Sequence, residues 1–211
     1  MAAHVGDDPA AVAANRRDLR QQLQLPAEPA WLNQVHGCAV IRAGQTGAAT
    51  ADASWTQVPG SICAVLTADC LPLLLCDRDG GCIAAVHVGW RGLVAGVIQA
   101  AVASLPVEPG RLLAWLGPCI GPGAFEVGAE VYAACQQTLP GADAGFHDGR
   151  PGRWQADLPA LTRLALKQAG LIACYDSELC TYSQPQDFYS YRRDGRTGRM
   201  AALIWMDATP T

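Results

Sequence analysis

Charged residues are scarce in this sequence: Asp, Glu, Lys and Arg make up only 16% of its 211 residues, and the formal net charge is −4. Apart from a short arginine cluster within residues 192–199, the chain has no basic stripe, so its composition gives no indication of a nucleic-acid-binding surface. No apolar run approaches the roughly 20 residues that a membrane-spanning helix requires. We therefore expect no nucleic acid and no membrane among its partners.

Features of secreted and small metal-binding domains are also absent. Residues 1–19 carry acidic side chains early and have no apolar central region, so we expect no signal peptide and a cytoplasmic location. The nine cysteines are odd in number and include no C-x-x-C pair, which argues against a disulfide framework, a zinc ribbon or a thioredoxin-type motif. Four histidines are too few for a multicopper cluster.

The chain contains no internal repeat, no low-complexity segment and no linker long enough to divide it. One domain over residues 1–211 is therefore expected, and half of the residues are apolar, which is enough for a sizeable core. Its centre is the stretch 61–98, where strands are predicted at about 61–67, 71–76 and 82–88. These runs are apolar on both faces, which predicts burial between layers, and residues 77–81 (DRDGG) indicate a hairpin turn.

Other elements are predicted on both sides of this centre. The expected helices are 7–25, 93–105, 129–139 and 157–169, and the expected strands are 30–35, 38–42, 111–116, 178–182 and 200–205. Residues 44–54 and 140–153 are expected to be loops. Asp52 lies in the first of these loops, where it is expected only to cap or turn the chain.

Three candidate metal ligands, His36, Cys70 and His87, fall at the ends of predicted strands. If those strands are neighbours, the side chains converge at one rim of the sheet. Two imidazoles and a thiolate suit Zn2+, and three protein ligands leave a fourth position open, which is typical of a catalytic zinc site. Asp69, beside Cys70, could orient a ligand histidine or move a proton.

Other interpretations of these residues remain open. Their spacing matches no local zinc motif, so each could be an ordinary structural residue. Copper would also accept two histidines and a cysteine. A metal-free site is the third alternative, with Cys70 as the nucleophile of a hydrolase and His87 as its base.

A second candidate site is the turn GWRG at residues 89–92. Arg91 stands where the predicted helix 93–105 begins, and the free N–H groups of a helix start together with a guanidinium can hold phosphate. The alternative is a structural ion pair between Arg91 and Asp69.

Five motifs together resemble one known family, the YfiH-like or laccase-domain family. They are NQVHG (33–37), TADCLPLLL (67–75), AAVHVGWRGLVAGV (84–97), LGPCIGPGAFEVGAEV (116–131) and FYSYRRDGRTGRMAALIW (188–205). They occur in the family's order and span nearly the whole chain. Members of this family were long labelled polyphenol oxidases and are now regarded as purine nucleoside phosphorylases.

The resemblance implies an α/β (α+β) fold, a single-domain layered α/β sandwich with mixed β-sheets, related to the deamidase domain of the cytotoxic necrotizing factor toxins. It also implies a zinc site made by His36, Cys70 and His87. The implied reaction is phosphorolysis of adenosine, inosine, guanosine and methylthioadenosine, with deamination of adenosine as a side activity. Family members usually begin with a further strand-rich segment, which we expect to be absent here.

The expected function is therefore that of a zinc-dependent purine nucleoside phosphorylase, acting as a monomer or weak homo-oligomer. Arg91 is the phosphate candidate, and Asn33, Gln34 and Cys119 are expected to shape the pocket or to be structural. The alternatives are a cysteine hydrolase, a copper-dependent phenol oxidase and a non-catalytic metal-binding protein.

Overall fold

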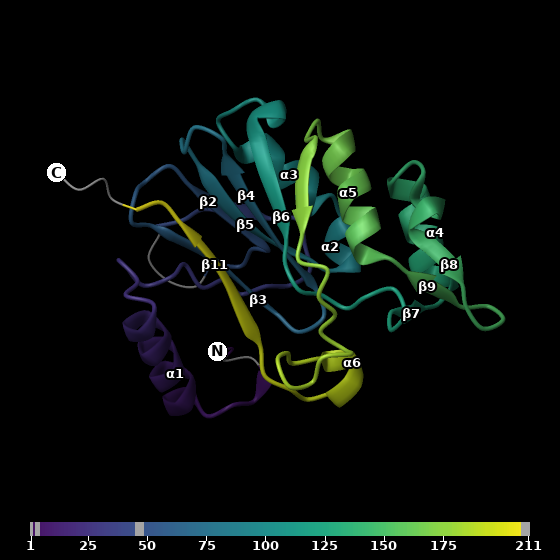
Figure 1. Ribbon diagram of the computed structural model, residues 1–211, viewed down its shortest axis with the longest axis horizontal. Coiled ribbons are helices and arrows are strands. Elements are labelled where there is room, and N and C mark those ends of the chain that lie inside the picture. Colours follow the sequence, from purple (N-terminus) through teal and green to yellow (C-terminus); the bar gives the residue numbers. More distant parts are fainter. Residues whose placement is uncertain (1, 3–4, 45–48, 208–211) are drawn as a thin grey trace.

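The computed structural model describes residues 2, 5–44 and 49–207, and within them strands and helices form a layered α/β structure (Figure 1). The largest sheet has six strands. In spatial order they are β1 (Val40–Arg42), β2 (Ala53–Thr56), β5 (Ile83–Val88), β4 (Leu71–Asp77), β6 (Leu112–Leu116) and β10 (Ala173–Asp176). The two outer pairs, β1–β2 and β6–β10, are parallel, and the inner pairs are antiparallel. The mixed sheet expected from the family resemblance is confirmed.

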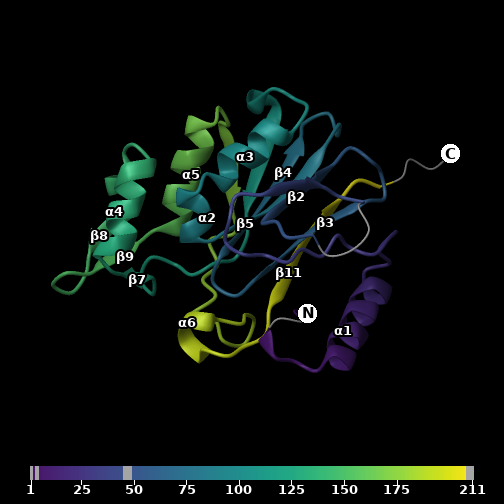
Figure 2. The same cartoon turned by 180° about the vertical axis from the view of Figure 1, so that it is seen from behind.

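Two smaller sheets accompany the large one. Strand β11 (Met200–Trp205) pairs antiparallel with β3 (Ile62–Thr67), and Figure 1 shows this pair in front of the large sheet. Strands β7 (Glu126–Val127), β9 (Trp154–Ala156) and β8 (Phe146–Asp148) form a small antiparallel sheet. The small sheet lies beside helix α4 (Ala129–Thr138), at the opposite end of the molecule from α1 (Pro9–Gln22) (Figures 1 and 2).

Alternation along the central strands creates a core on each face of the large sheet. On β5, the side chains of Ala84, Val86 and Val88 belong to a core shared with the helices, whereas Ile83 and Ala85 belong to a core shared with β3 and β11. Because both faces are covered, every residue of β5 is buried, as the apolar runs predicted. Figure 2 shows the helices on the face away from β11. They are α2 (Trp90–Val94), α3 (Val97–Ser104) and α5 (Leu158–Gln168).

The predicted helix over 93–105 is instead two helices, α2 and α3. Gly96, between them, has a φ of 84°, a left-handed conformation that glycine adopts without steric cost and that ends an α-helix. The helices predicted at 7–25, 129–139 and 157–169 are confirmed as α1, α4 and α5. Aspartates at positions 8 and 157 cap α1 and α5, and each accepts a hydrogen bond from the backbone of the first turn.

Two predicted strands are wrong. Residues 30–35 make only isolated bridges, because the backbone N–H groups of residues 35–37 donate to a side chain, that of Asp52, rather than to a neighbouring strand. Residues 178–182 make one bridge, at Cys180, next to a left-handed Glu178 (φ 58°).

Some elements were not predicted. They are β2, within the expected loop 44–54 and its continuation, β10, the three short strands β7 to β9 and the one-turn helix α6 (Tyr191–Asp194). Residues 45–48 of that loop lie outside the described residues. Strand β11, which was predicted over 200–205, is half-buried and pairs with β3 on one side only. None of the helices in the described part of the chain is long and apolar enough to cross a membrane.

Candidate metal centre and active site

The three predicted ligands meet at one edge of the large sheet. Cys70 directly precedes β4, and His87 is the next-to-last residue of β5. These strands are antiparallel with Leu71 opposite Val88, so the beginning of one lies beside the end of the other. His36 approaches from the loop before β1, and its ring lies 4.7 Å from that of His87, centroid to centroid. One ligand atom from each of the three residues lies within 4.8 Å of the other two.

This geometry fits a metal ion bound by three protein ligands. Tetrahedral zinc with bonds of about 2.0–2.3 Å separates its ligand atoms by roughly 3.3–3.8 Å. The His36 Nε2 atom is 3.7 Å from the Cys70 Sγ atom, which lies in that range. His87 is 3% exposed, Cys70 is half-buried and His36 is exposed, so the cluster is closed on the protein side and accessible on the other.

Asp52 binds two of the three ligand residues. Its Oδ1 atom lies 2.8 Å from His87 Nδ1 and accepts the backbone N–H of His36 at 2.9 Å. A carboxylate can only accept, so His87 Nδ1 carries the proton and Nε2 is the free ligand atom. Burial raises the pKa of Asp52, but the hydrogen bonds from His87 and from the backbone of Gly37 and Val35 outweigh it, and the pKa lies below its usual value.

Gly89 leaves the space that the ligands occupy. A Cβ atom at this position would lie 2.9 Å from the Cδ2 atom of His36 and 3.1 Å from the Cys70 Sγ atom, closer than side chains tolerate. The turn after β5 therefore needs glycine so that its backbone can pass against the cluster.

Cys70 and His87 are strongly coupled electrostatically. Burial raises the pKa of the Cys70 thiol, but the charge of His87 and hydrogen bonds with both histidines lower it from 9.0 to about 6. Burial lowers the pKa of His87, whereas the Cys70 thiolate and Asp52 raise it from 6.5 to about 9. At neutral pH the cluster thus holds a thiolate beside an imidazolium, and a cation that binds there displaces the imidazolium proton.

A cavity of about 450 Å³ opens beside the cluster. It is lined by Gln34, His36, Leu66, Thr67, Ala68, Asp69, Cys70, His87, Gly89, Trp90, Arg91, Ile120, Phe125, Leu158, Tyr191, Arg192 and Arg199. Its volume lies within the roughly 300–1,000 Å³ typical of small-molecule sites. Apolar rings and three guanidinium groups line the same space as the metal ligands, so the cavity suits a partly aromatic, partly anionic ligand.

Asp69 connects the metal-ligand loop with the segment that forms the far wall of the cavity. Its carboxylate accepts the Thr181 hydroxyl at 2.7 Å and the backbone N–H of Arg192 at 2.6 Å, and its carbonyl accepts the N–H of Ile120 at 2.9 Å. Its backbone is left-handed (φ 88°), a conformation that costs energy for a residue with a side chain. The carboxylate is therefore occupied in positioning this wall, and the proton-transfer role expected for it stays a prediction.

The predicted substrate-binding residues occupy different surroundings. Arg91 lines the cavity, and its guanidinium lies 4.5 Å from the centre of the Trp90 ring. The ion pair considered between Arg91 and Asp69 is not formed, because the Asp69 carboxylate binds the Thr181 hydroxyl and the backbone N–H of Arg192 instead. Gln34 lines the cavity but pairs with the backbone of Leu66 through both its amide nitrogen and its amide oxygen, each at 2.8 Å.

Asn33 does not belong to the cavity lining; its amide nitrogen donates to the Thr50 hydroxyl. Cys119 is 3% exposed and packs in the core, while its neighbour Ile120 reaches the cavity. Arg91 is the second residue of a helix of only five residues, so the helix dipole expected to assist it is weaker than that of the single helix predicted over 93–105.

Comparison with protein families gives a match over residues 1–207 to the family described as multi-copper polyphenol oxidoreductase laccase. The chain belongs to this family. The resemblance noted in the sequence is thereby confirmed. Two relatives of this laccase-domain protein are named for a different activity from the one in the family's description. A purine nucleoside phosphorylase of Pseudomonas aeruginosa is 49% identical over 207 residues, covering 98% of this chain and 85% of the relative. The purine nucleoside phosphorylase YfiH of Escherichia coli is 46% identical over 208 residues, with the same coverage.

Solved structures of laccase-domain proteins share the fold. A crystal structure of a Neisseria meningitidis protein superposes with a TM-score of 0.93 at 47% identity, covering 98% of this chain and 86% of that one. The crystal structure of YlmD from Geobacillus stearothermophilus gives a TM-score of 0.93 at 31% identity, covering 99% and 84%. The layered α/β fold is thus that of the laccase-domain family.

Sequence reasoning missed three polar residues of this laccase-domain site. Asp52 carried no signal, because a lone aspartate in a small-residue loop resembles a turn residue. Arg192 and Arg199 line the cavity, but in the sequence they belong to a basic cluster typical of a solvated surface. Carbonyl oxygens hold both guanidinium groups: Arg192 donates to Glu126, and Arg199 donates to residues 197 and 198. The one signal in the sequence was that Tyr191 and two glycines accompany these arginines, which is unusual for a purely solvated basic cluster.

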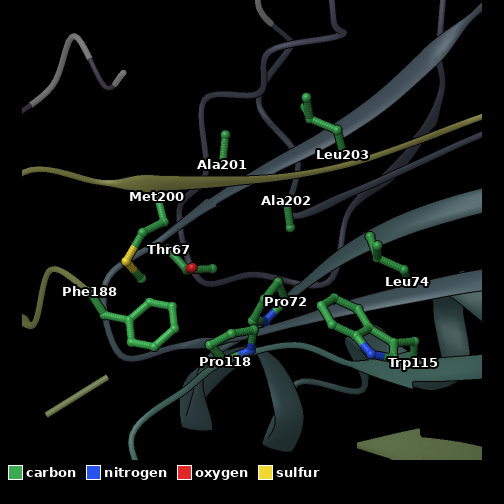
Figure 3. A pocket seen from close by; sticks show the side chains of 10 residues that line it. All are labelled: Thr67, Pro72, Leu74, Trp115, Pro118, Phe188, Met200, Ala201, Ala202 and Leu203. Atoms are coloured by element: carbon green, nitrogen blue, oxygen red, sulfur yellow. The ribbon is translucent and has the colours of Figure 1, made fainter. Parts of the chain in front are cut away.

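A second cavity of about 460 Å³ lies between β11 and strands β4 and β6 of the large sheet (Figure 3). Figure 3 shows Phe188, Pro118 and Trp115 along one side and the strand of Met200 and Ala202 along the other. The hydroxyl of Thr67 is the one side-chain oxygen among the lining residues. Among the lining residues no acid, base or strong metal ligand accompanies this hydroxyl, and the thioether of Met200 is a weak ligand at most.

Proposed function

We propose that this laccase-domain protein is a zinc-dependent purine nucleoside phosphorylase. It would convert adenosine, inosine, guanosine or methylthioadenosine, together with phosphate, to the free base and the pentose 1-phosphate. The observation that carries the proposal is the open His–Cys–His cluster at the wall of a cavity that also presents three arginines. The names of the relatives from P. aeruginosa and E. coli support it.

His36, Cys70 and His87 would hold the metal ion, and the donor set favours zinc over copper because no methionine is among the residues that line the cavity beside it. When bound, zinc supplies a Lewis acid and lowers the pKa of coordinated water to about 7. Oxidation by several coppers is not supported, because the described residues form one three-ligand group and the sequence has four histidines in all.

The residues of the chain provide positioning and charge. Arg91, with Arg192 and Arg199 across the same cavity, would hold the phosphate so that one of its oxygens faces the anomeric carbon of the ribose. The new C–O bond forms as the bond to the purine nitrogen breaks; the electron pair leaves with the purine, and the proton that the phosphate loses on becoming an ester balances the one that the purine takes up. Trp90, Phe125 and Tyr191 offer rings against which the base can pack.

We further propose that the same site deaminates adenosine slowly, with water replacing the amino group and ammonia leaving. The protein would act as a monomer or weak homo-oligomer in the cytoplasm. Its partners would be purine nucleosides and phosphate.

One observation favours a second candidate, a metal-free cysteine hydrolase. Cys70, His87 and Asp52 have the order of contacts of a nucleophile, a base and an orienting carboxylate, and the Cys70 pKa is lowered to about 6. Chelation separates the two candidates, because removal of zinc would abolish phosphorolysis and leave a thiolate nucleophile intact.

The test is chromatography of the products after zinc-loaded protein is incubated with adenosine, and separately with each of the other three nucleosides, with and without phosphate. We expect adenine to appear only with phosphate and to disappear after chelation and in Cys70→Ala. Inosine as the sole product, independent of phosphate, would replace the phosphorylase by a deaminase. If none of the four nucleosides is consumed, the proposal is wrong, and retained amidase activity after chelation would favour the hydrolase.

A further inference from the structure

We propose that Asp52 is the positioning residue that preforms the metal site, because one buried carboxylate fixes both histidine ligands. The inference rests on the metal-binding part of the proposed function. It concerns how residues of the chain itself fix the geometry that an ion requires.

The carboxylate of Asp52 uses all of its acceptor positions. Oδ1 lies 2.8 Å from His87 Nδ1 and 2.9 Å from the backbone nitrogen of His36, and Oδ2 lies 2.7 Å from that of Gly37 and 3.2 Å from that of Val35. A carboxylate has about four lone-pair sites. An amide or hydroxyl at this position could not accept from four donors.

These contacts determine the arrangement of each histidine differently. At His87 the Nδ1–H is held, so Nε2 is the ring nitrogen left to bind a metal ion and the ring cannot turn away. At His36 it is the backbone that is held. Its φ of 60° is unfavourable for a residue with a side chain, and three consecutive N–H groups donating to one carboxylate stabilise that turn.

The main chain of Asp52 is fixed as well. Its carbonyl accepts the N–H of His87 at 2.7 Å, and its own N–H donates to the carbonyl of Ala39 at 3.0 Å. Asp52 therefore connects the His36 loop with β5 through both its side chain and its backbone, and a shift at one histidine is transmitted to the other.

A purely structural cap explains this arrangement less well. Asp52 is 0% exposed, and its one cationic partner among the described residues is His87 itself. Burying a carboxylate without a permanent cation is costly, and a neutral side chain is the cheaper way to close a turn. The negative charge has a use at this position if it increases the basicity of a ligand histidine and partly offsets the charge of a bound cation.

The test compares Asp52→Asn with Asp77→Asn. Asp77 is a matched control because it is also buried (4% exposed) and accepts a backbone N–H, from Gly81, but it lies at the other end of β4 and pairs with Arg111. We expect Asp52→Asn to weaken zinc binding about 10- to 100-fold in chelator competition. It should also change the visible spectrum of the cobalt-loaded protein, which reports ligand geometry. Asp77→Asn should lower thermal stability and leave both readouts unchanged.

Neither readout needs a nucleoside, so the outcomes are distinct. If the wild-type protein binds zinc and Asp52→Asn binds it equally well with the same cobalt spectrum, the inference is wrong and the proposed function stands. If the wild-type protein binds neither metal, both are wrong. Should Asp52→Asn fail to fold, Asp52→Glu replaces it, since it keeps the charge but displaces the carboxylate by one methylene. Wild-type affinity in that variant would contradict the inference.

Discussion

Two cavities of nearly equal volume, about 450 and 460 Å³, lie side by side in this protein and share the lining residue Thr67. One contains the His–Cys–His cluster and three arginines, and the other is almost entirely apolar. Volume therefore does not mark the site. The candidate active site is identified by its side chains, because metal-ligating and cationic groups converge on one cavity and are missing from the lining of the other.

Strand position explains the difference. Cys70 and Asp69 stand just before β4, and His87 stands at the end of β5, where the backbone leaves the ladder and side chains are free to converge. The apolar cavity is lined instead by residues within strands, such as Leu74 and Ala202, whose alternation fixes them toward the core between sheets. A rigid sheet thus supplies a functional rim and an apolar interior from the same strands.

The largest expected effect is the loss of a metal ligand. Cys70→Ala or His87→Ala should reduce phosphorolysis and zinc affinity by more than the roughly 10- to 100-fold typical of an outer-shell partner. Product chromatography and chelator competition measure the two effects. Cys174→Ala, a half-buried thiol on β10, serves as control and should retain both. If Cys70→Ala is as active as Cys174→Ala, the His–Cys–His cluster does not distinguish one cavity from the other, and the basis of the proposed function is removed.

The acidity of Cys70 should also distinguish the functional cavity. In metal-free protein, the thiolate absorbance that is lost in Cys70→Ala should appear with a midpoint near pH 6 rather than 9.0. Folding lowers this pKa, so the thiolate contributes stability above pH 9.0 that is lost as the pH falls through about 6. His87 has the opposite sign: its contribution is complete below pH 6.5 and is lost as the pH rises through about 9. Between these pH values the contribution of the thiolate rises with pH while that of His87 falls, so the free energy of unfolding should change little with pH. A midpoint near pH 9 for the Cys70 thiol would contradict its pairing with His87.

A methyl group at Gly89 should disturb the cluster by pressing on two of its three side chains. In Gly89→Ala the new Cβ would lie 2.9 Å from His36 and 3.1 Å from Cys70 Sγ, so the ligands must move, and zinc affinity should fall about tenfold or more. Gly123→Ala is the matched control, because nothing lies within 4 Å of a Cβ there. Chelator competition on both variants measures the effect. Similar affinities in the two would show that the ligands tolerate displacement.

The sequence was sufficient to predict which three side chains come together and where the central strands lie. Cys70 and His87 lie at the ends of strongly apolar runs, which have few alternatives in a chain of this composition, whereas His36 follows a mixed segment that is not a strand in the structure. The strands β3, β4 and β5 were predicted within a residue or two of their observed bounds for the same reason.

Residues whose role depends on contacts far along the chain could not be predicted. Asp52 accepts from a histidine 35 positions away, and Thr181 donates to Asp69 from 112 positions away. The parallel strand β10 is half-buried and mixed in polarity, so no periodicity marks it. Arg192 and Arg199 enter the cavity because Asp69 holds the backbone of this segment, which a single sequence does not reveal.

Removing one of the cavity arginines should have a moderate effect. Arg91→Ala should raise the KM for phosphate about tenfold, close to the roughly 1.5–3 kcal/mol of a charge-assisted hydrogen bond reduced by solvent exposure, with little change in zinc affinity. Steady-state kinetics with varied phosphate measure it. Arg78→Ala, an exposed arginine in the hairpin turn, is the control. An unchanged KM in Arg91→Ala would transfer the phosphate role to Arg192 and Arg199.

The smallest effect is expected in the apolar cavity. Trp115 lines the apolar cavity but not the functional one, and it is 39% exposed. Trp115→Ala should therefore lower the free energy of unfolding by about 1 kcal/mol and leave kcat, KM and zinc affinity within roughly twofold of the wild-type values. Thermal unfolding and steady-state kinetics measure these. The two cavities adjoin at Thr67, which lines both, so the expectation is not trivial. A loss of activity greater than tenfold would show that the apolar cavity supports the rim mechanically, and the separation between a functional and an inert cavity would no longer hold.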